Sequence, residues 1–514
     1  MSNRKFCVRV SWVAIAAIAA LAMFPSLMPV CAAGAPQEAA KPANAAPARV
    51  AAAPVPWTIL IYGAADNNAD GPIFEWLADV RHAVADDPGL NLVLFVDRAK
   101  GYSTSAEPLG EEFTGGRLYL VHEKSAERLA GGDEFPEMKL DAECETDSAD
   151  PATLRKFLRF GKAHFPAKHT GLIIYSHASG ITMCPDVESG RDMGIAELTA
   201  ATEDEDTVAW TALELCNMGG IEIAYQWRPG NGGFSTEVLV AIPNAGPPLD
   251  WDRVFGRVHT PGSAAAKGRG DVVDPAQLSP REFGRIAVEE GEKGRRAAFE
   301  RRPQARDHLA HEAAAAYDLT AVESVKQAVD AFAVELARGG AAARDALLAL
   351  RGTVPPAAGT TPLMNYVGEE LDRGRPFVDL QDLLKRAGDC DALDAATRAT
   401  TKPAMAALAK FMIASFGMDG YAGFEPGRNG VFVVFPRCDG SKVAALSAGP
   451  RAWSSYAWYS PNPFRDGKTL EGDLSWCRDG ATAGDGKVEN WFELLDAWYD
   501  PENGGDGGAN GWRW

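Results

Sequence analysis

Residues 171–177, with the sequence GLIIYSH, decide the fold class of this 514-residue chain. The run is short and apolar until its end, which is typical of a strand that is buried on both faces. Similar runs occur at 57–62 (WTILIY), 92–96 (LVLFV), 208–215 (VAWTALEL) and 238–242 (VLVAI). Helical patterns separate these runs along the chain. The alternation predicts an α/β fold, in which a mostly parallel sheet is flanked by helices.

Two connecting segments carry more specific signals. Asp150 and Pro151 predict the start of a helix, with Asp150 as its N-cap and proline in its first turn. A second helix is predicted over residues 218–227, directly after the strand that contains Leu215. Residues 98–149 combine Gly-rich pieces with short alternating runs, which indicates a hairpin or an insertion at the edge of the sheet.

Composition excludes several classes of protein. The chain has 51 basic and 70 acidic side chains and a formal charge of −19, so we expect no nucleic-acid partner. An apolar fraction of 46% is too high for wholesale disorder. Eight cysteines are too few for a disulfide scaffold of this length.

The N-terminus predicts export. Residues 1–33 begin with basic side chains, continue with an apolar run over 10–28 and end in small residues, as a cleavable signal peptide does. An uncleaved membrane anchor is the alternative. Residues 34–56 are rich in alanine and proline and are expected to form a linker. We therefore expect a secreted or periplasmic protein without a membrane segment after cleavage.

A histidine and a cysteine follow two of the predicted strands. His177 comes after the strand at 171–175, and Cys216 comes after the strand at 208–215. The carboxyl ends of parallel strands meet at one edge of a sheet, so an imidazole and a thiol are expected there together. Such a pair can act as a nucleophilic dyad, and the amides of a following helix would favour the thiolate. The alternative is ordinary packing. Cys184 is a rival nucleophile, but no strand-to-helix junction supports it.

The surroundings of both residues resemble the motifs of the clostripain family of cysteine peptidases. Residues 173–180 (IIYSHASG) are similar to the histidine motif, and residues 213–219 (LELCNMG) are similar to the nucleophile motif. Further similar segments lie in the family's order at 57–68 (WTILIYGAADNN), 238–252 (VLVAIPNAGPPLDWD), 377–380 (FVDL) and 429–436 (NGVFVVFP). In patches, the resemblance covers residues 57 to 500.

The resemblance implies a caspase-like sheet and hydrolysis of peptide bonds through a thioester on Cys216. His177 would be the acid/base, and the backbone amides of Cys216 and Ala178 would stabilise the oxyanion. The family cuts after arginine or lysine. Glu214 stands where the family usually has aspartate, so it would bind the basic side chain of the substrate. A solvated acid at the end of the strand is the alternative for Glu214.

Two departures from the family pattern bear on activity. Ala178 replaces the glycine that normally follows the histidine, and this adds a methyl group beside the oxyanion site. Residues 241–244 (AIPN) replace a small polar and acidic run, which removes a second acidic group for the substrate. A catalytically silent binding module of the cell envelope is therefore the alternative function. A structural protein that cleaves only itself is a further one.

The resemblance also suggests a domain plan. A catalytic domain is expected at 57–261, a helical region with a processing loop at 262–356, and a C-terminal α/β region with a Gly-rich tail at 357–514. Residues 280–350 have a helical period, which predicts that Tyr317 lies on the apolar face of a helix. Five arginines between Arg295 and Arg306 form either a charged helix surface or part of a self-cleavage region that extends back to Arg253.

Peptides and proteins are the expected partners. No metal site and no cofactor are expected. Some members of the family use calcium, but no loop here supplies a convincing set of ligands. After the signal peptide and Cys216 are set aside, five cysteines remain, so at least one has no partner for a disulfide within the chain.

Overall fold

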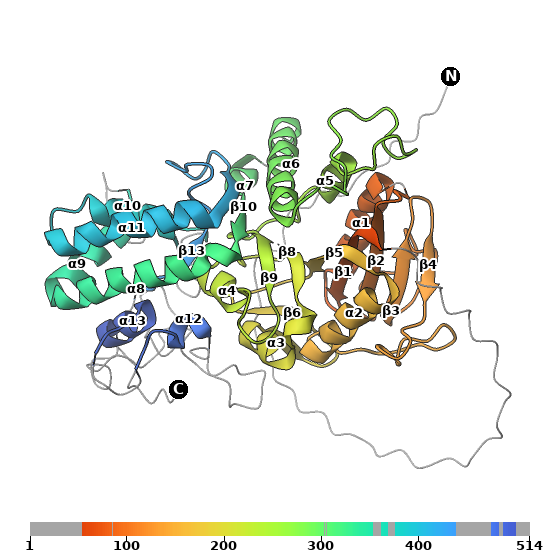
Figure 1. Cartoon of the computed structure of the whole chain (residues 1–514), viewed down its shortest axis with the longest axis horizontal. Helices are drawn as coiled ribbons and strands as arrows, with labels where there is room; N and C mark the ends of the chain where they lie inside the picture. Colours follow the sequence, from red (N-terminus) through yellow and green to blue (C-terminus); the bar gives the residue numbers. More distant parts are fainter. Residues whose placement is uncertain are drawn as a thin grey trace, which may run out of the picture. The chain divides into compact units, whose positions relative to one another are not determined.

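A nine-stranded mixed sheet organises the computed structural model (Figure 1). The structure describes residues 54–499 except 85, 303, 305, 353–360, 368–375, 438–473 and 483–486. The order of strands across the sheet is β12-β10-β9-β8-β5-β1-β2-β3-β4. The strands of this sheet are β1 (Val55–Ala65), β2 (Leu90–Arg98), β3 (Gly115–Val121), β4 (Ala126–Leu129), β5 (Ala167–Tyr175), β8 (Val208–Glu214), β9 (Thr236–Ala241), β10 (Ala313–Asp318) and β12 (Met412–Gly417).

The centre of the sheet is parallel and its edges are antiparallel. Strands β9, β8, β5, β1 and β2 run in the same direction. The hairpin of β3 and β4 closes one edge, and β10 with β12 closes the other. These findings confirm the predicted α/β class and the hairpin within residues 98–149. Two small ribbons pair β6 (Thr182–Asp186) with β7 (Arg191–Gly194) and β11 (Phe377–Asp379) with β13 (Phe432–Val434).

Helices connect and cover the strands. Helix α2 begins as predicted, because the Asp150 side chain accepts a hydrogen bond from the Ala152 amide and Pro151 occupies the first turn. The α-helices are α1 (Asp70–Val84), α2 (Pro151–His164), α3 (Ile195–Ala201), α4 (Ile221–Gln226), α5 (Trp251–Arg257), α6 (Pro280–Arg301), α7 (Arg306–Leu309), α8 (Val322–Arg338), α9 (Gly340–Arg351), α10 (Leu380–Gly388), α11 (Ala395–Phe411), α12 (Ser475–Arg478) and α13 (Trp491–Tyr499). Short 3₁₀ turns are η1 (Asp204–Asp206) and η3 (Leu319–Ala321).

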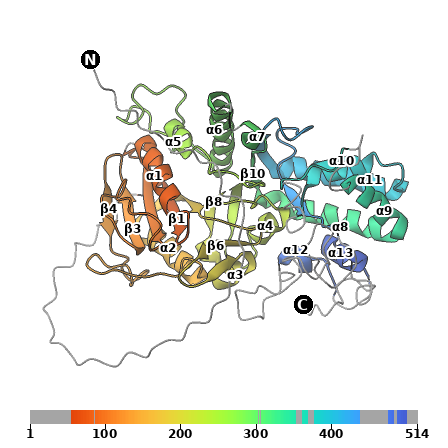
Figure 2. The same ribbon diagram turned by 180° about the vertical axis from the view of Figure 1, so that it is seen from behind.

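Two hydrophobic clusters lie on opposite faces of the sheet. Helices α1, α5 and α6 bury one face, where Trp210, Trp251 and Phe283 stack together. Helices α2, α3, α4, α8 and α11 bury the other face. Figure 2 shows the same separation from behind, with α5 and α6 on one side of the strands and α3 and α4 on the other. Because both faces are covered, the central strands contain continuous apolar runs.

The sheet crosses the boundary that the sequence suggests at residue 261. Strand β10 lies within the expected helical region at 262–356, and β12 lies in the expected C-terminal region. Tyr317 was expected on a helix, but it pairs with Leu239 of β9 as part of β10. Helix α6 precedes this strand within the expected helical region, and the helical pattern resumes after it at Val322, with α8. The three predicted regions from residue 57 onward therefore each contribute strands to the same central sheet.

Some predictions fall on parts of the chain that the structure does not describe. They concern the signal peptide at 1–33, most of the linker at 34–56, Cys438 and the Gly-rich tail. Among the helices of the described residues, none has the length and apolar character needed to span a bilayer.

Candidate active site

The strand register brings the two predicted dyad residues to one edge of the sheet. Strands β5 and β8 are neighbours, and Tyr175 of β5 pairs with Glu214 of β8. His177 and Cys216 each follow two positions later, so they leave the sheet at the same level. This edge is the carboxyl end of the parallel strands, where functional groups gather in open α/β sheets.

The imidazole of His177 lies at the surface of this edge. Its outer side is exposed, but the surrounding chain removes enough water to lower its pKa below the ordinary value of 6.5. The Cys184 amide donates a 3.0 Å hydrogen bond to the His177 carbonyl and holds the backbone in place. A neutral imidazole at pH 7 can accept a proton from a thiol.

The Cys216 thiol is half-buried, and its Sγ lies 3.8 Å from the carbonyl oxygen of Gly246. The next residue, Asn217, has a φ of 62°, a left-handed conformation that asparagine tolerates better than most residues do. This residue turns the chain sharply away from the strand. The turn therefore presents the sulfur at the end of β8.

The predicted helix over residues 218–227 begins later than expected. Helix α4 starts at Ile221, after an N-cap at Gly220. The amides of Asn217 and Met218 instead donate 2.9 Å hydrogen bonds to carbonyls of the segment that follows β9, at Asn244 and Ile242. The expectation that helix amides beside Cys216 favour its thiolate is therefore wrong, because those amides bind a neighbouring loop.

Ala178 occupies an unstrained position. Described residues other than glycine with positive φ are Asp86, Cys184 and Asn217, so Ala178 does not need the conformational freedom of glycine. Hydrogen bonds from Cys184 to His177 and from the Ser179 amide to the Thr182 carbonyl fix the backbone on both sides of it. The alanine that replaces the family's glycine is therefore compatible with this turn.

Glu214 is buried rather than solvated. Its carboxylate oxygens accept hydrogen bonds of 2.6 Å from the Leu249 amide and from the Trp251 indole N–H. Burial raises the pKa of this carboxyl to about 7, and these hydrogen bonds oppose the shift. The alternative of a solvated acid at the strand end is wrong. In this conformation Glu214 holds the loop before α5, and its binding to a substrate remains a prediction.

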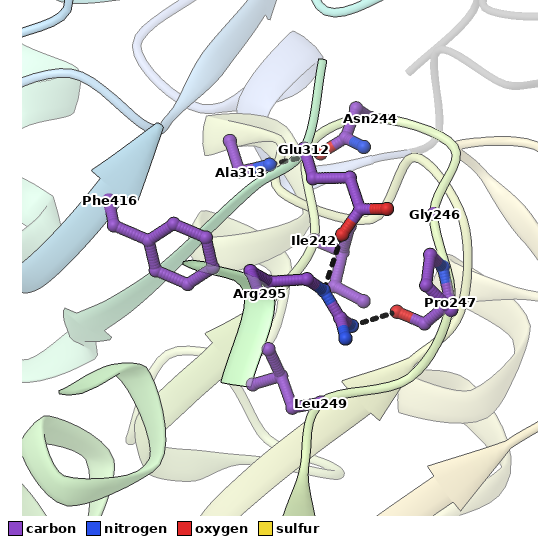
Figure 3. Close-up of a pocket in the computed structure, with 9 residues that line it drawn as sticks. All are labelled: Ile242, Asn244, Gly246, Pro247, Leu249, Arg295, Glu312, Ala313 and Phe416. Carbon is purple, nitrogen blue, oxygen red and sulfur yellow. Dashed lines mark hydrogen bonds and ion pairs between the residues drawn. The ribbon is translucent and has the colours of Figure 1, made fainter. Parts of the chain in front are cut away.

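A small cavity lies near Cys216. It contains Gly246, whose carbonyl faces the Cys216 sulfur, and Arg295, which enters it from α6 (Figure 3). The residues that line it are Ile242, Asn244, Gly246, Pro247, Leu249, Arg295, Glu312, Ala313 and Phe416. The side chain of Asn244 fixes one wall, because it accepts a hydrogen bond from the Ala313 amide and donates one to the His311 carbonyl.

Sequence reasoning missed the position of Arg295. The sequence indicates that Arg295 belongs to a charged helix surface or to a cleavage region, but in the structure its side chain is buried. A usable signal was present, since Gly284, Val288 and Gly291 precede Arg295 at helical spacing on one buried face of α6. The absence of a side chain at Gly291 and Gly294 lets this face approach Leu249 and Asp250 closely.

Comparisons with known proteins show similarity to cysteine proteases. Among solved structures it aligns with an inactive zymogen C11 protease from Parabacteroides distasonis, with a TM-score of 0.47, 14% identity and coverage of 74% of this chain and 93% of that one. It also aligns with a secreted C11 cysteine protease from Bacteroides thetaiotaomicron in complex with an irreversible peptide inhibitor, with a TM-score of 0.45, 14% identity and coverage of 75% and 94%.

Sequence similarity is much stronger. Clostripain from Hathewaya histolytica is 32% identical to this chain over 489 residues, which is 89% of each protein. A model of the clostripain family matches residues 61–498, nearly the whole range that the structure describes. The chain therefore belongs to the clostripain family and is a cysteine-type endopeptidase.

Proposed function

We propose that this protein is a secreted clostripain-like endopeptidase that uses Cys216 as its nucleophile and His177 as its acid/base. One observation carries the assignment of the dyad. Tyr175 pairs with Glu214, so His177 and Cys216, each two positions later, lie at the same level of the same sheet edge. Family membership supplies the reaction class, and the two motifs supply the residue types that this class requires.

The reaction has two halves. His177 takes the thiol proton from Cys216, and the sulfur attacks the carbonyl carbon of the peptide to form a tetrahedral oxyanion. The C–N bond then breaks, His177 returns the proton to the leaving amine, and a thioester remains. A water molecule gives a proton to His177 as it attacks the thioester. Collapse of this second intermediate breaks the C–S bond, releases the carboxyl product and restores the thiol.

Backbone amides are the proposed oxyanion donors. The amides of Cys216 and Ala178 belong to the two turns that follow β8 and β5. Hydrogen bonds hold both turns in place: those around Ala178 lie within its turn, and those of the Asn217 and Met218 amides run to the loop after β9. Rigid donors that already point at the developing charge stabilise a transition state more than mobile ones do.

The proposal includes a preference for a basic residue before the cleaved bond. Support comes from the acidic groups near the cavity beside Cys216, which are Glu214, Asp250 and Glu312. A carboxylate in a site with little water binds a guanidinium strongly. The strength of this preference depends on Arg295, which already lies among these groups.

Export and self-processing complete the proposal. The signal-like residues 1–33 support secretion or a periplasmic location. Between α5 and α6 the chain forms an irregular loop (Figure 1). Lys267 and Arg269 in this loop are exposed. Peptidases cut exposed irregular segments in preference to helices. This loop is the proposed site of self-cleavage within the range from Arg253 to Arg306.

Substitution of the dyad tests the function. We expect Cys216→Ala and His177→Ala each to reduce kcat/KM for peptides with arginine or lysine before the cleaved bond by about 10³-fold or more, since each change removes a participant in every turnover. Hydrolysis of fluorogenic peptides by the purified protein measures this. Cys184→Ser is the matched control, because it removes a buried thiol close to His177 and should leave the activity intact.

Activity that survives Cys216→Ala would remove this residue from its assigned role. Complete inactivity of the wild-type chain, together with no labelling by thiol-reactive peptide probes, would instead support the silent binding module.

A further inference from the structure

Arg295 enters the cavity beside Cys216 from a distant part of the chain. The residue belongs to α6, whereas the loop at 242–249 follows β9 and Glu312 immediately precedes β10. The carbonyl of Gly246, which faces the Cys216 sulfur, belongs to this same loop. The guanidinium of Arg295 therefore lies in a cavity that shares Gly246 with the surroundings of the Cys216 sulfur.

The contacts of Arg295 are those of a bound guanidinium. Its Nη2 donates to the Pro247 carbonyl at 2.7 Å and also to the Pro248 carbonyl. Its Nη1 lies 3.3 Å from a carboxylate oxygen of Asp250, and its Nε forms an ion pair with Glu312. Figure 3 shows the guanidinium between Glu312 on one side and Pro247 on the other. Two carbonyls and two carboxylates thus surround one planar cation.

This arrangement leaves little attraction for a second cation. The side chains of Arg295 and Glu312 are 9% and 4% exposed, so water screens their ion pair weakly. Burial raises the pKa of Glu312 to about 7, and Arg295 opposes that shift. An arginine side chain of a substrate would find these acceptors already bonded.

We propose that Arg295 is a built-in occupant of a guanidinium site beside the nucleophile and thereby determines specificity. It weakens the preference for a basic residue that Glu312 and Asp250 would otherwise create. Once the Arg295 side chain is removed by substitution, the site would bind an alkylguanidinium, such as the side chain of a substrate arginine. The specificity part of this proposal rests on the proposed peptidase function, whereas the binding part does not.

Ligand binding tests the site without any need for catalysis. We expect methylguanidinium to raise the Tm of Arg295→Ala, because the small cation replaces the missing group, and to leave the Tm of the wild type unchanged. Methylurea has the same shape without the charge and is the control compound. Equal shifts with both compounds, or no shift with methylguanidinium, would overturn the proposal.

Kinetics test the consequence for specificity. We expect Arg295→Met to raise the ratio of kcat/KM for arginine peptides over leucine peptides by about tenfold or more, since a charge-assisted pair becomes available to the substrate. The double variant Arg295→Met/Glu312→Gln is the matched control. It removes both partners of the ion pair, protects the fold from an unpaired charge and should lose most of that gain.

The two failures can be told apart. A ratio that stays the same in a folded and active Arg295→Met variant makes Arg295 a structural residue only. Absence of hydrolysis by every variant, including the wild type, counts against the proposed function. The methylguanidinium experiment then still decides whether the guanidinium site exists.

Discussion

In the proposed mechanism, His177 determines the pH range in which the enzyme can begin a turnover. Burial lowers the pKa of its imidazole below 6.5, so the neutral form predominates at pH 7. Protonated histidine cannot accept the thiol proton, and activity is therefore lost as the pH falls through this pKa. We expect the acid limb of kcat/KM to have its midpoint below pH 6.5. The pH profile with a peptide that has leucine before the cleaved bond measures this.

A leucine peptide is needed because other groups titrate nearby. Burial raises the pKa values of Glu214 and Glu312 to about 7, and both groups would affect the binding of a basic side chain. An arginine peptide should consequently show an additional loss of kcat/KM as the pH falls through about 7. An acid limb above pH 6.5 with the leucine peptide would contradict the role of His177.

Single residues differ in how far the sequence predicts them. His177 and Cys216 follow apolar strands directly, so their place at the sheet edge could be inferred from local sequence. The bonding of Glu214 to Leu249 and Trp251 could not be inferred, because it depends on how a loop more than thirty residues later returns to β8. Arg295 was missed for a related reason, since a buried arginine needs partners from elsewhere in the chain.

The loop between α5 and α6 is the element most open to cleavage. Lys267 and Arg269 are exposed there, whereas Arg281 lies in the first turn of α6 and forms an ion pair with Asp318. We expect the wild-type chain to be cut after Lys267 or Arg269 and the double variant Lys267→Ala/Arg269→Ala to stay whole. Gel electrophoresis and N-terminal sequencing of the new fragment measure the cut.

Two variants serve as references for this prediction. Cys216→Ala should also stay whole if the cut is made by the enzyme itself, and Arg281→Ala should still be cut. Wild-type protein that remains a single chain while it hydrolyses added peptides would show that maturation in this loop is unnecessary.

Strand β10 shows where local propensity misleads. Its sequence, AAAAYD over Ala313–Asp318, has the composition of a good helix. Its alanines are buried between β9 and β12 and against α6, where small side chains allow close packing. Tertiary burial therefore overrides the helix propensity of alanine. Because β10 does not have the sequence pattern of a strand, the boundary predicted at residue 261 separates β10 and β12 from the other strands of their sheet.

Several buried carboxyl groups make the stability of the whole molecule depend on pH. Burial raises the pKa of Asp66 to about 6 and that of Glu222 to about 7, and it raises the pKa of Asp97 as well. The folded chain thus binds more protons than the unfolded chain at pH values between about 4 and 7. The free energy of unfolding should therefore decrease as the pH rises through this window.

We expect a higher Tm at pH 5.5 than at pH 8, measured by thermal unfolding of Cys216→Ala to avoid self-digestion. Asp97→Asn should raise the Tm more at pH 8 than at pH 5.5, because burial disfavours the ionised form of Asp97 and the amide has no ionised form. The contribution of Asp87 to the pH dependence has the opposite sign. Burial would raise the pKa of Asp87, but hydrogen bonds from His259 and Thr260 outweigh that effect and lower the pKa to about 2. A Tm that rises steadily from pH 5.5 to pH 8 would contradict the prediction.

By itself, the sequence determined the class of fold, the strands of the parallel sheet and the edge at which His177 and Cys216 lie. These features follow from short apolar runs and from the residues directly after them, which are local properties of the chain. Only the tertiary structure decided what surrounds Cys216. The guanidinium of Arg295, the carboxylate of Glu312 and the carbonyl of Pro247 come from three separate segments. Their meeting depends on the packing of α6 against the sheet, which no local pattern encodes.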